Sequence, residues 1–229
     1  MRRAIVGLAV SLLVIAPGSL PAQKKRCPPL DSLAPWAMVN RAWSRDTAAA
    51  RTDEALRLRL LALAAKDQEI RRDFGTRMTD SSYARQLLAL DDSLAAEVLE
   101  ILDRVGLPTR RMVGSDGSDA FMLVVQHNWS LQERVLALAR QAAPGEISPQ
   151  ALAMLEDRVL VHQGKAQRFG TQFNATGDGV FHFARTVALD GLEERRARAG
   201  LPPMDQYVCM LEEAGMKVDH ASLPAPPPR

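Results

Sequence analysis

The sequence predicts a mainly α protein, a single helical domain with one late β-hairpin. Leu and Ala dominate the composition and β-branched residues are few, which favours helices. Apolar residues recur at helical spacing through most of the chain. Late in the chain this pattern gives way to aromatic residues at alternate positions, which is typical of strands.

The first 22 residues are predicted to be a cleaved secretory signal peptide. Two arginines precede a short apolar run over 4–16, a Pro-Gly pair interrupts it, and Ala22 is a small residue suited to cleavage. The run is shorter than the roughly 20 apolar residues that a spanning helix needs. We therefore expect a secreted or periplasmic protein with no stable membrane span after the signal peptide is removed.

Charge gives no indication of a nucleic-acid partner. The full chain carries 29 Lys+Arg and 27 Asp+Glu, and the signal peptide removes two arginines and no acid, so the mature chain is neutral overall. The basic runs KKR (24–26) and RRAR (195–198) are short, and we interpret both as solvated surface.

The chain has two cysteines, Cys27 and Cys209. In an oxidising compartment they could bridge the two ends of the domain, and both staying free fits the sequence equally well. Because no C-x-x-C spacing occurs, neither a metal site nor thiol redox chemistry is indicated.

The helical domain is expected over 36–215, after a Pro-rich lead-in over 23–35. Helices are predicted over 36–44, 52–72, 81–105 with a renewed start at Asp91-Asp92, 115–128, 130–142 and 148–162. Ser148 followed by Pro149 marks a helix start, while Gly106 and Gly164 mark ends.

The β-hairpin is predicted near 166–187, with strands on either side of the turn-rich NATGDG. If QRFGTQ is a strand, Gln167, Phe169 and Thr171 share one of its faces. Arg168, Gly170 and Gln172 then share the other. Two further helices are expected over 191–199 and 204–214, and residues 216–229 are predicted to be a disordered Pro-rich tail.

Common catalytic and cofactor motifs are missing from the sequence. It contains no P-loop, no G-x-G-x-x-G, no G-x-S-x-G and no H-E-x-x-H, and its four histidines lack metal-ligand spacing. We therefore predict no cofactor and no metal, while an enzyme without them remains open.

Several polar side chains are candidates for a functional role. Asp67 and Arg71 stand four residues apart on a predicted helix, where a surface ion pair is the ordinary interpretation. His127 lies on the apolar face of its helix, so both ring nitrogens need partners; a core histidine and a catalytic one both fit. Asp157 and Arg158 are adjacent, point in different directions, and must each find a partner elsewhere.

Several of these residues belong to short motifs in a fixed order: DQEIR (67–71), GLPT (106–109), VVQH (124–127), EDR (156–158), QRFGTQ (167–172) and RRARAGLPPMDQY (195–207). The order resembles an uncharacterised bacterial domain-of-unknown-function family with the motifs DQxxR, GWPT, VQH, DR, QxYGTQ and RRxxxGLxPxxxY. Leu107 and Phe169 depart from the tryptophan and tyrosine of that pattern. The resemblance implies no reaction. It implies one recurring set of residues: Asp67, Gln68, Arg71, Gln126, His127, Asp157, Arg158, Gln167, Thr171 and Gln172.

Two functions fit this set. In the first, it forms a small-ligand or enzymatic site with His127 as general acid–base and Asp157 or Asp67 orienting it. His127 and Asp157 are then the catalytic candidates, one of the two arginines holds an anionic group, and the glutamines bind amide or hydroxyl groups. In the second, the chain is a non-catalytic module that recognises a protein or cell-envelope component, and the polar set is a buried structural network.

Overall fold

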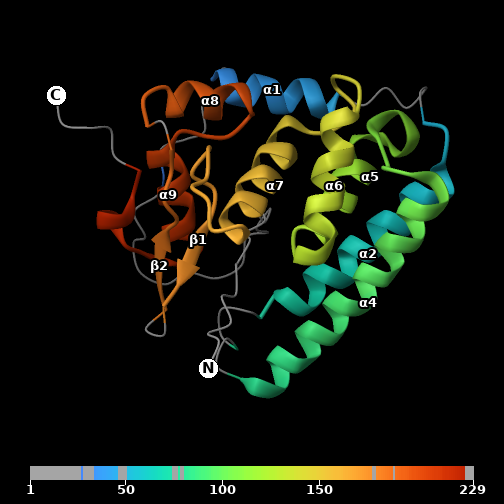
Figure 1. Ribbon diagram of the computed structural model, residues 1–229, viewed down its shortest axis with the longest axis horizontal. Helices are drawn as coiled ribbons and strands as arrows, with labels where there is room; N and C mark the ends of the chain where they lie inside the picture. Colours follow the sequence, from blue (N-terminus) through green and yellow to red (C-terminus); the bar gives the residue numbers. More distant parts are fainter. Residues whose placement is uncertain are drawn as a thin grey trace. The chain divides into compact units, whose positions relative to one another are not determined.

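The computed structural model describes residues 27, 34–45, 51–73, 77, 80–176, 179–187 and 189–224. The predicted signal peptide, the KKR run and most of the Pro-rich lead-in lie outside these residues. Helices predominate and a small three-stranded sheet lies late in the chain, which confirms the mainly α class (Figure 1). Within the described ranges, no helix has both the length and the apolar character needed to cross a membrane.

The helices lie close to their predicted positions. They are α1 (Pro35–Ser44), α2 (Glu54–Arg71), α4 (Ser81–Val105), α5 (Arg110–Val125), α6 (Trp129–Gln141), α7 (Pro149–His162), α8 (Leu192–Arg198) and α9 (Met204–Glu213).

Two of these helices differ from the prediction. α4 continues through Asp91 without a renewed start, because the Asp91 side chain binds Arg71 of another helix. α5 begins at Arg110, but its backbone is kinked at Gly114, whose φ is 77°, so its longer second part starts at the predicted Ser115. Glycine permits this backbone conformation without a steric penalty.

The described chain divides into two compact units, where the sequence predicts one helical domain. The first, here called the helical unit, comprises residues 41–155. The second, the sheet unit, comprises the described residues up to Asn40 together with those from Glu156 onward. The chain passes between the units within α1 and within α7.

In the helical unit, α2 packs mainly on α5, and α4 contacts both (Figure 1). Fully buried apolar side chains from α2, α4 and α5 form the core: Leu60, Val98, Ile101, Val113, Phe121 and Val125. Gly117 of α5 allows α2 to come close, because a Cβ there would lie 3.2 Å from Cγ of Arg57 and 2.9 Å from Cβ of Val113.

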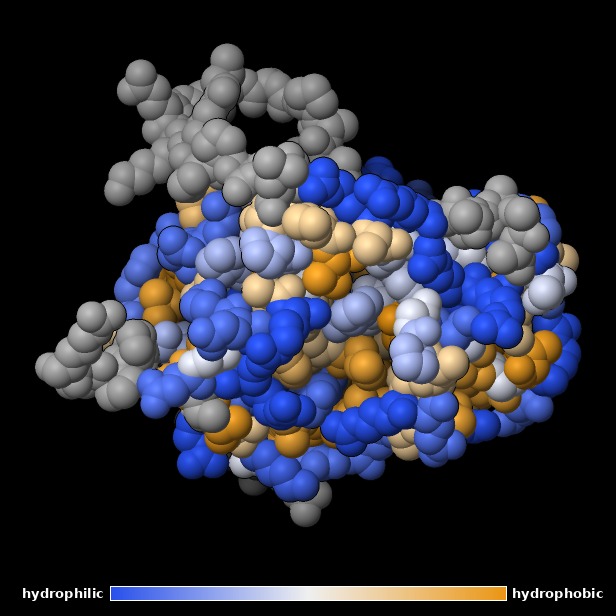
Figure 2. Space-filling model, turned by 90° about the horizontal axis from the view of Figure 1, so that it is seen from above, coloured by the Kyte–Doolittle hydropathy of each residue, from blue (hydrophilic) through white to orange (hydrophobic). Residues whose placement is uncertain are grey.

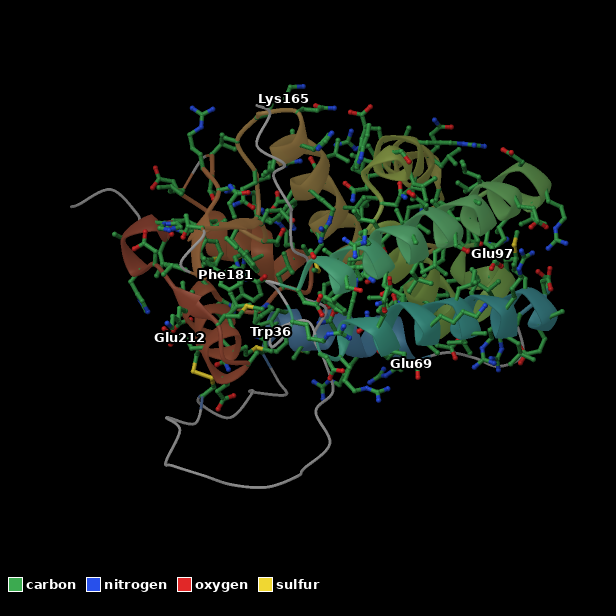
Figure 3. The ribbon with its side chains drawn as sticks, turned by 90° about the horizontal axis from the view of Figure 1, so that it is seen from below. Trp36, Glu69, Glu97, Lys165, Phe181 and Glu212 are labelled. Atoms are coloured by element: carbon green, nitrogen blue, oxygen red, sulfur yellow. A yellow bond between two sulfur atoms is a disulfide. The ribbon has the colours of Figure 1, made fainter. Side chains whose placement is uncertain are left out.

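In the sheet unit, β1 (Phe173–Ala175) and β2 (Val180–Phe183) form the predicted antiparallel hairpin. β3 (Lys217–Val218) pairs in parallel with the other edge of β2. The core joins the strands to α8 and α9: Phe173, Phe181 (labelled in Figure 3), Phe183, Leu192, Met204, Tyr207, Val208 and Leu211. The ring centroids of Phe173 and Phe181 are 5.1 Å apart in an edge-to-face arrangement, which is favourable for aromatic pairs.

Two predictions for the sheet unit were wrong. Residues 168–172 form a loop instead of a strand, because Asp157 accepts the backbone N–H groups that a neighbouring strand would otherwise bind. Residues 217–222, assigned to the disordered tail, form β3 and the 3₁₀ turn η2 (His220–Ser222). Asp219 N donates to Phe181 O at 2.9 Å, which ties this segment to β2. Residues 225–229 lie outside the described residues.

The Cys27–Cys209 disulfide is formed, with the two Cα atoms 5.7 Å apart. Its sulfur–sulfur bond is drawn in yellow near Glu212 of α9 in Figure 3. Cys27 N also donates to Oε1 of Glu213 at 2.9 Å. The bridge therefore attaches the beginning of the described chain to α9, which settles the two alternatives left open by the sequence.

Exposed apolar side chains are scattered, as is usual for folded proteins. On the face drawn in Figure 2, hydrophilic residues cover most of the visible surface and apolar residues lie between them in small groups. The large apolar side chains that are exposed among the described residues come from several different elements: Met38, Leu58, Leu88, Leu99, Trp129 and Val187.

Candidate functional site

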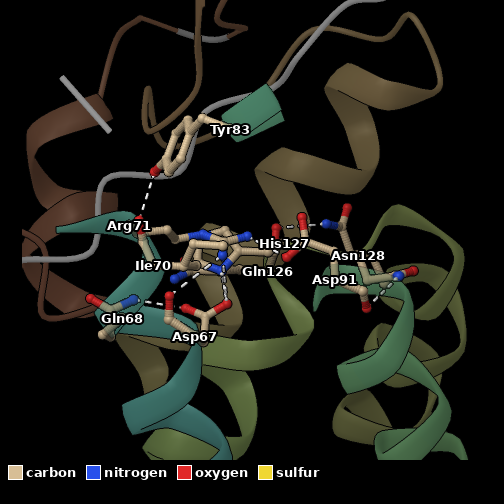
Figure 4. Close-up of polar contacts among 10 residues, drawn as sticks. Asp67, Gln68, Ile70, Arg71, Tyr83, Asp91, Gln126, His127 and Asn128 are labelled. Atoms are coloured by element: carbon tan, nitrogen blue, oxygen red, sulfur yellow. Dashed lines mark hydrogen bonds and ion pairs between the residues drawn. The ribbon is translucent and has the colours of Figure 1, made fainter. Parts of the chain in front are cut away.

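His127 and Asp67 form a hydrogen-bonded pair in the helical unit (Figure 4). Asp67 lies in the last turns of α2 and is completely buried, while His127 follows the end of α5. Nδ1 of His127 lies 2.9 Å from Oδ1 of Asp67. Since an ionised carboxylate can only accept, this contact puts a proton on Nδ1 and fixes the orientation of the ring. Of the two carboxylates predicted to orient His127, Asp67 makes the contact.

Arg71 joins Asp67 to a second carboxylate. Its guanidinium lies 3.1 Å from Oδ1 of Asp67 and 2.5 Å from Oδ1 of Asp91, which comes from α4. The interpretation of Asp67 and Arg71 as a surface ion pair was therefore wrong, because Asp67 has no exposed surface. Burial raises the pKa of Asp91 above its ordinary value, although the hydrogen bond and charge of Arg71 act in the opposite direction.

The partners of this cluster extend along three helices. Gln68 donates from Nε2 to Oδ2 of Asp67 at 2.8 Å. The backbone carbonyl of Gln126 accepts from Nε2 of Gln132 at 2.9 Å, and the Asn128 side chain caps α6 by accepting from Ser130 N. These contacts hold the chain on both sides of His127.

The four side chains of this cluster differ in how much of their surface is exposed. The side chain of Asp67 is 0% exposed, whereas those of His127, Arg71 and Asp91 are 8%, 14% and 15% exposed. His127 and Arg71 thus keep a small exposed fraction, while the carboxylate that orients both is completely buried. We call Asp67, Arg71, Asp91 and His127 the histidine cluster.

Asp157 organises a separate network in the sheet unit. Its Oδ1 accepts from Arg168 N at 2.6 Å and Phe169 N at 3.0 Å, and its Oδ2 accepts from Thr171 N at 3.1 Å and Thr171 Oγ1 at 2.9 Å. Burial raises the pKa of Asp157, and these donors partly offset that effect. With its oxygens engaged in this way, Asp157 holds the loop over 168–172 in place.

The two glutamines of QRFGTQ are part of the same structural network. Gln167 is completely buried, and its Nε2 donates to Gln172 O at 2.9 Å and Ala184 O at 2.8 Å. Its Oε1 accepts from Gln172 N at 2.8 Å. The Gln172 amide donates to Oγ1 of Thr171 at 3.1 Å. Gln167 therefore closes the loop on itself and fastens it to the end of β2.

Two buried arginines lie near Tyr207 in the sheet unit. Arg158 of α7 and Arg196 of α8 are 6% and 0% exposed, and the guanidinium carbon of Arg196 lies 5.1 Å from the centre of the Tyr207 ring. Burial raises the pKa of Tyr207 to about 12, against the charges of Arg196 and Arg158, which act in the opposite direction. We call Arg158, Arg196 and Tyr207 the arginine cluster.

The predicted residue set is thus distributed over both units. Asp67, Gln68, Arg71, Gln126 and His127 belong to the helical unit. Asp157, Arg158, Gln167, Thr171 and Gln172 belong to the sheet unit. The catalytic roles of His127 and Asp157 stay predictions.

Sequence reasoning missed three members of the two clusters. Asp91 was interpreted as a helix cap, although it is the second carboxylate of Arg71. Arg196 belongs to the RRAR run interpreted as solvated surface, and that interpretation was wrong for Arg196, which is completely buried. The motif RRARAGLPPMDQY contains both Arg196 and Tyr207, so it was the available signal for both.

Comparison with known proteins identifies a family but no characterised relative. Within the described part of the chain, no group of His, Cys, Asp and Glu side chains could hold a metal ion. No curated protein and no solved structure matches the sequence. A family model described as "Family of unknown function (DUF6624)" matches residues 54–219, which include both clusters. The chain therefore belongs to this family of unknown function.

Proposed function

We propose that the histidine cluster is a small-ligand or enzymatic site, in which His127 exchanges a proton with the bound molecule. The observation that carries the proposal is the 2.9 Å contact between a partly exposed imidazole and a fully buried carboxylate. A carboxylate on Nδ1 holds the ring and stabilises its protonated form, and Nε2 is the nitrogen through which the ring would act.

Charge indicates the kind of group that this site accepts. The cluster contains two carboxylates and one guanidinium, and both carboxylates are within ion-pair distance of Arg71. Arg71 is therefore a poor holder for an anionic ligand. A neutral or cationic polar group, which can donate a hydrogen bond to the partly exposed Asp91, suits the cluster better.

We also propose that the protein acts outside the cytoplasm. The Cys27–Cys209 disulfide supports this, since such bridges persist in oxidising compartments. The predicted signal peptide supports it independently.

One observation favours the alternative of a non-catalytic module. The loop over 168–172 is held by hydrogen bonds within the sheet unit, which involve the side chains of Asp157, Gln167 and Thr171. Such bonds are typical of a structural network. This part of the recurring residue set needs no ligand to explain it.

Replacement of His127 by Ala separates the two functions. A thermal-shift screen with small metabolites first identifies a compound that stabilises the wild-type protein. The His127→Ala variant should lose this binding, or any activity on the compound, by a factor of about 100 or more. Its unfolding free energy should stay within about 1 kcal/mol of the wild type, because Asp67 keeps Arg71 and Gln68 as partners.

His220→Ala is the matched control. His220 forms an exposed imidazole–carboxylate pair with Glu212, at 2.6 Å, and its loss should change neither binding nor stability measurably. A His127→Ala variant that binds the compound as the wild type does would overturn the proposal. A large loss of stability in that variant, with no compound found, would favour the structural alternative.

A further inference from the structure

We propose that the arginine cluster of the sheet unit is a binding site for a small oxyanion, a carboxylate or a phosphate. This site shares no residue with the histidine cluster, and the inference does not depend on the function proposed for His127. The arginine cluster would bind an anion, whereas the histidine cluster suits a neutral or cationic group.

Arg158 presents an unused binding edge. Nε and Nη2 of its guanidinium are buried and have no hydrogen-bond partner among the described residues. These two nitrogens form one side of the planar guanidinium, the side that binds both oxygens of a carboxylate or phosphate at once. If this side chain only filled space, an apolar residue would do so without burying N–H groups that have no partner.

Arg196 adds a second donor group. Its Nε donates to Pro202 O at 2.8 Å, and its Nη1 donates to the carbonyls of Phe169 and Gly170, which anchors the loop over 168–172. Nη2 of the same guanidinium is buried and has no partner within the described part of the chain. One side of Arg196 is thus structural, and the other is available.

Arg158 has no carboxylate partner among the described residues. Asp157 is next to it in sequence, but its oxygens accept from Arg168 N, Phe169 N and Thr171. Arg196 is compensated in part, because burial lowers its pKa while Glu193 and Asp157 act against that effect. Burial lowers the pKa of Arg158 to about 10, and Tyr207 is the group that acts against this effect. An unpaired buried charge costs several kcal/mol, and an anion bound to it removes most of that cost.

Burial also limits the size of the ligand. Arg158 is 6% exposed and Arg196 is 0% exposed, so a macromolecular surface cannot reach both guanidinium groups. The buried edge of Arg158 can bind the two oxygens of one carboxylate or phosphate group, and Nη2 of Arg196 is a further buried donor in the sheet unit. The phenol of Tyr207, which donates to Thr171 O at 3.3 Å, lies in the field of both arginines and keeps its proton there.

The test uses the mature protein after dialysis into sodium chloride. Sodium phosphate and sodium acetate are titrated separately at constant ionic strength, and the melting temperature and heat of binding are measured. At least one oxyanion should raise the melting temperature above the chloride reference in a saturable manner. The two titrations distinguish a phosphate site from a carboxylate site.

Arg158→Met removes the binding edge and keeps an unbranched side chain of similar length. In chloride, its melting temperature should equal or exceed that of the wild type, because an unpaired buried charge has been removed. The oxyanion-dependent increase should disappear. Arg168→Met is the matched control, since Arg168 is half-exposed and its side chain pairs with Glu156, so the increase should persist.

Three results would overturn the proposal. The first is that neither phosphate nor acetate stabilises the wild type. The second is that the Arg158→Met variant keeps the full increase in melting temperature. The third is that this variant melts well below the wild type in chloride. If the Arg158→Met protein cannot be purified, Arg158→Lys replaces it. Lysine keeps the charge without the two-pronged edge, and its oxyanion affinity should fall at least tenfold.

Discussion

Asp157→Ala should destabilise the protein more than any neighbouring polar substitution on α7. Asp157 is completely buried and accepts hydrogen bonds from the N–H groups of Arg168, Phe169 and Thr171. Alanine leaves these donors without their acceptor. Water can reach Arg168, which is exposed, but Thr171 is buried and Phe169 is partly so.

The magnitude follows from these contacts. Each buried donor left unsatisfied costs about 1–3 kcal/mol, and the Thr171 hydroxyl loses its acceptor as well. Against this, alanine removes a carboxylate whose ionisation burial disfavours, as the raised pKa of Asp157 indicates. The balance is a loss of about 3 kcal/mol, which corresponds to roughly 10 °C in melting temperature for a chain of this size.

Urea unfolding followed by circular dichroism measures this loss, with Glu156→Ala as the control. Glu156 precedes Asp157 on α7 and pairs with half-exposed Arg168, so its removal should cost no more than about 1 kcal/mol. Equal stability of the two variants would refute the reasoning that Asp157 holds the loop. A stable Asp157→Ala protein that has lost ligand binding would instead favour the catalytic role predicted for Asp157.

Two further predictions concern the disulfide and the histidine cluster. Replacing Cys27 and Cys209 together by Ser should lower the unfolding free energy by up to about 5 kcal/mol, because the bridge closes a loop across 182 residues; a loss below about 1 kcal/mol in urea unfolding would contradict this. For Asp91, the raised pKa means that the folded chain holds the proton more tightly than the unfolded chain, so its contribution to stability is complete at low pH and is lost as pH rises through the folded pKa. The stability of Asp91→Asn relative to the wild type should therefore increase as pH rises through the raised pKa of Asp91, and a decreasing difference would show that the Arg71 contact outweighs burial.

The helices were predictable because their ends are marked locally. Ser148 followed by Pro149 begins α7, and Gly106 ends α4. The hairpin was predictable for the same reason, since alternating aromatic residues flank its turn. These signals depend on residues a few positions apart, which a sequence shows directly.

The loop over 168–172 could not be predicted in this way. Its alternation of residues fits a strand, but the carboxylate that binds its N–H groups comes from α7, and Asp157 stands eleven residues before Arg168. Asp91 was missed for a similar reason, because its partner Arg71 lies on another helix. Both depend on contacts between elements, which local patterns do not contain.

His127 was predicted to need a partner because it lies on an apolar face, and the pairing with Asp67 meets that need. The prediction could not choose between Asp67 and Asp157. It also could not tell which arginine is free to hold an anion. In the structure Arg71 faces two carboxylates, whereas the binding edge of Arg158 has no partner among the described residues.

This difference between the two arginines gives the two clusters opposite charge preferences. In the histidine cluster both carboxylates are within ion-pair distance of the one guanidinium group, that of Arg71. In the arginine cluster both guanidinium groups have buried N–H groups with no partner among the described residues. An oxyanion should therefore bind with an affinity that depends on Arg158 and not on His127. A cationic or neutral ligand of the histidine cluster should show the reverse dependence. The variants His127→Ala and Arg158→Met can therefore assign a ligand of this protein to one cluster or the other. An anionic ligand should lose affinity in Arg158→Met, and a neutral or cationic one in His127→Ala.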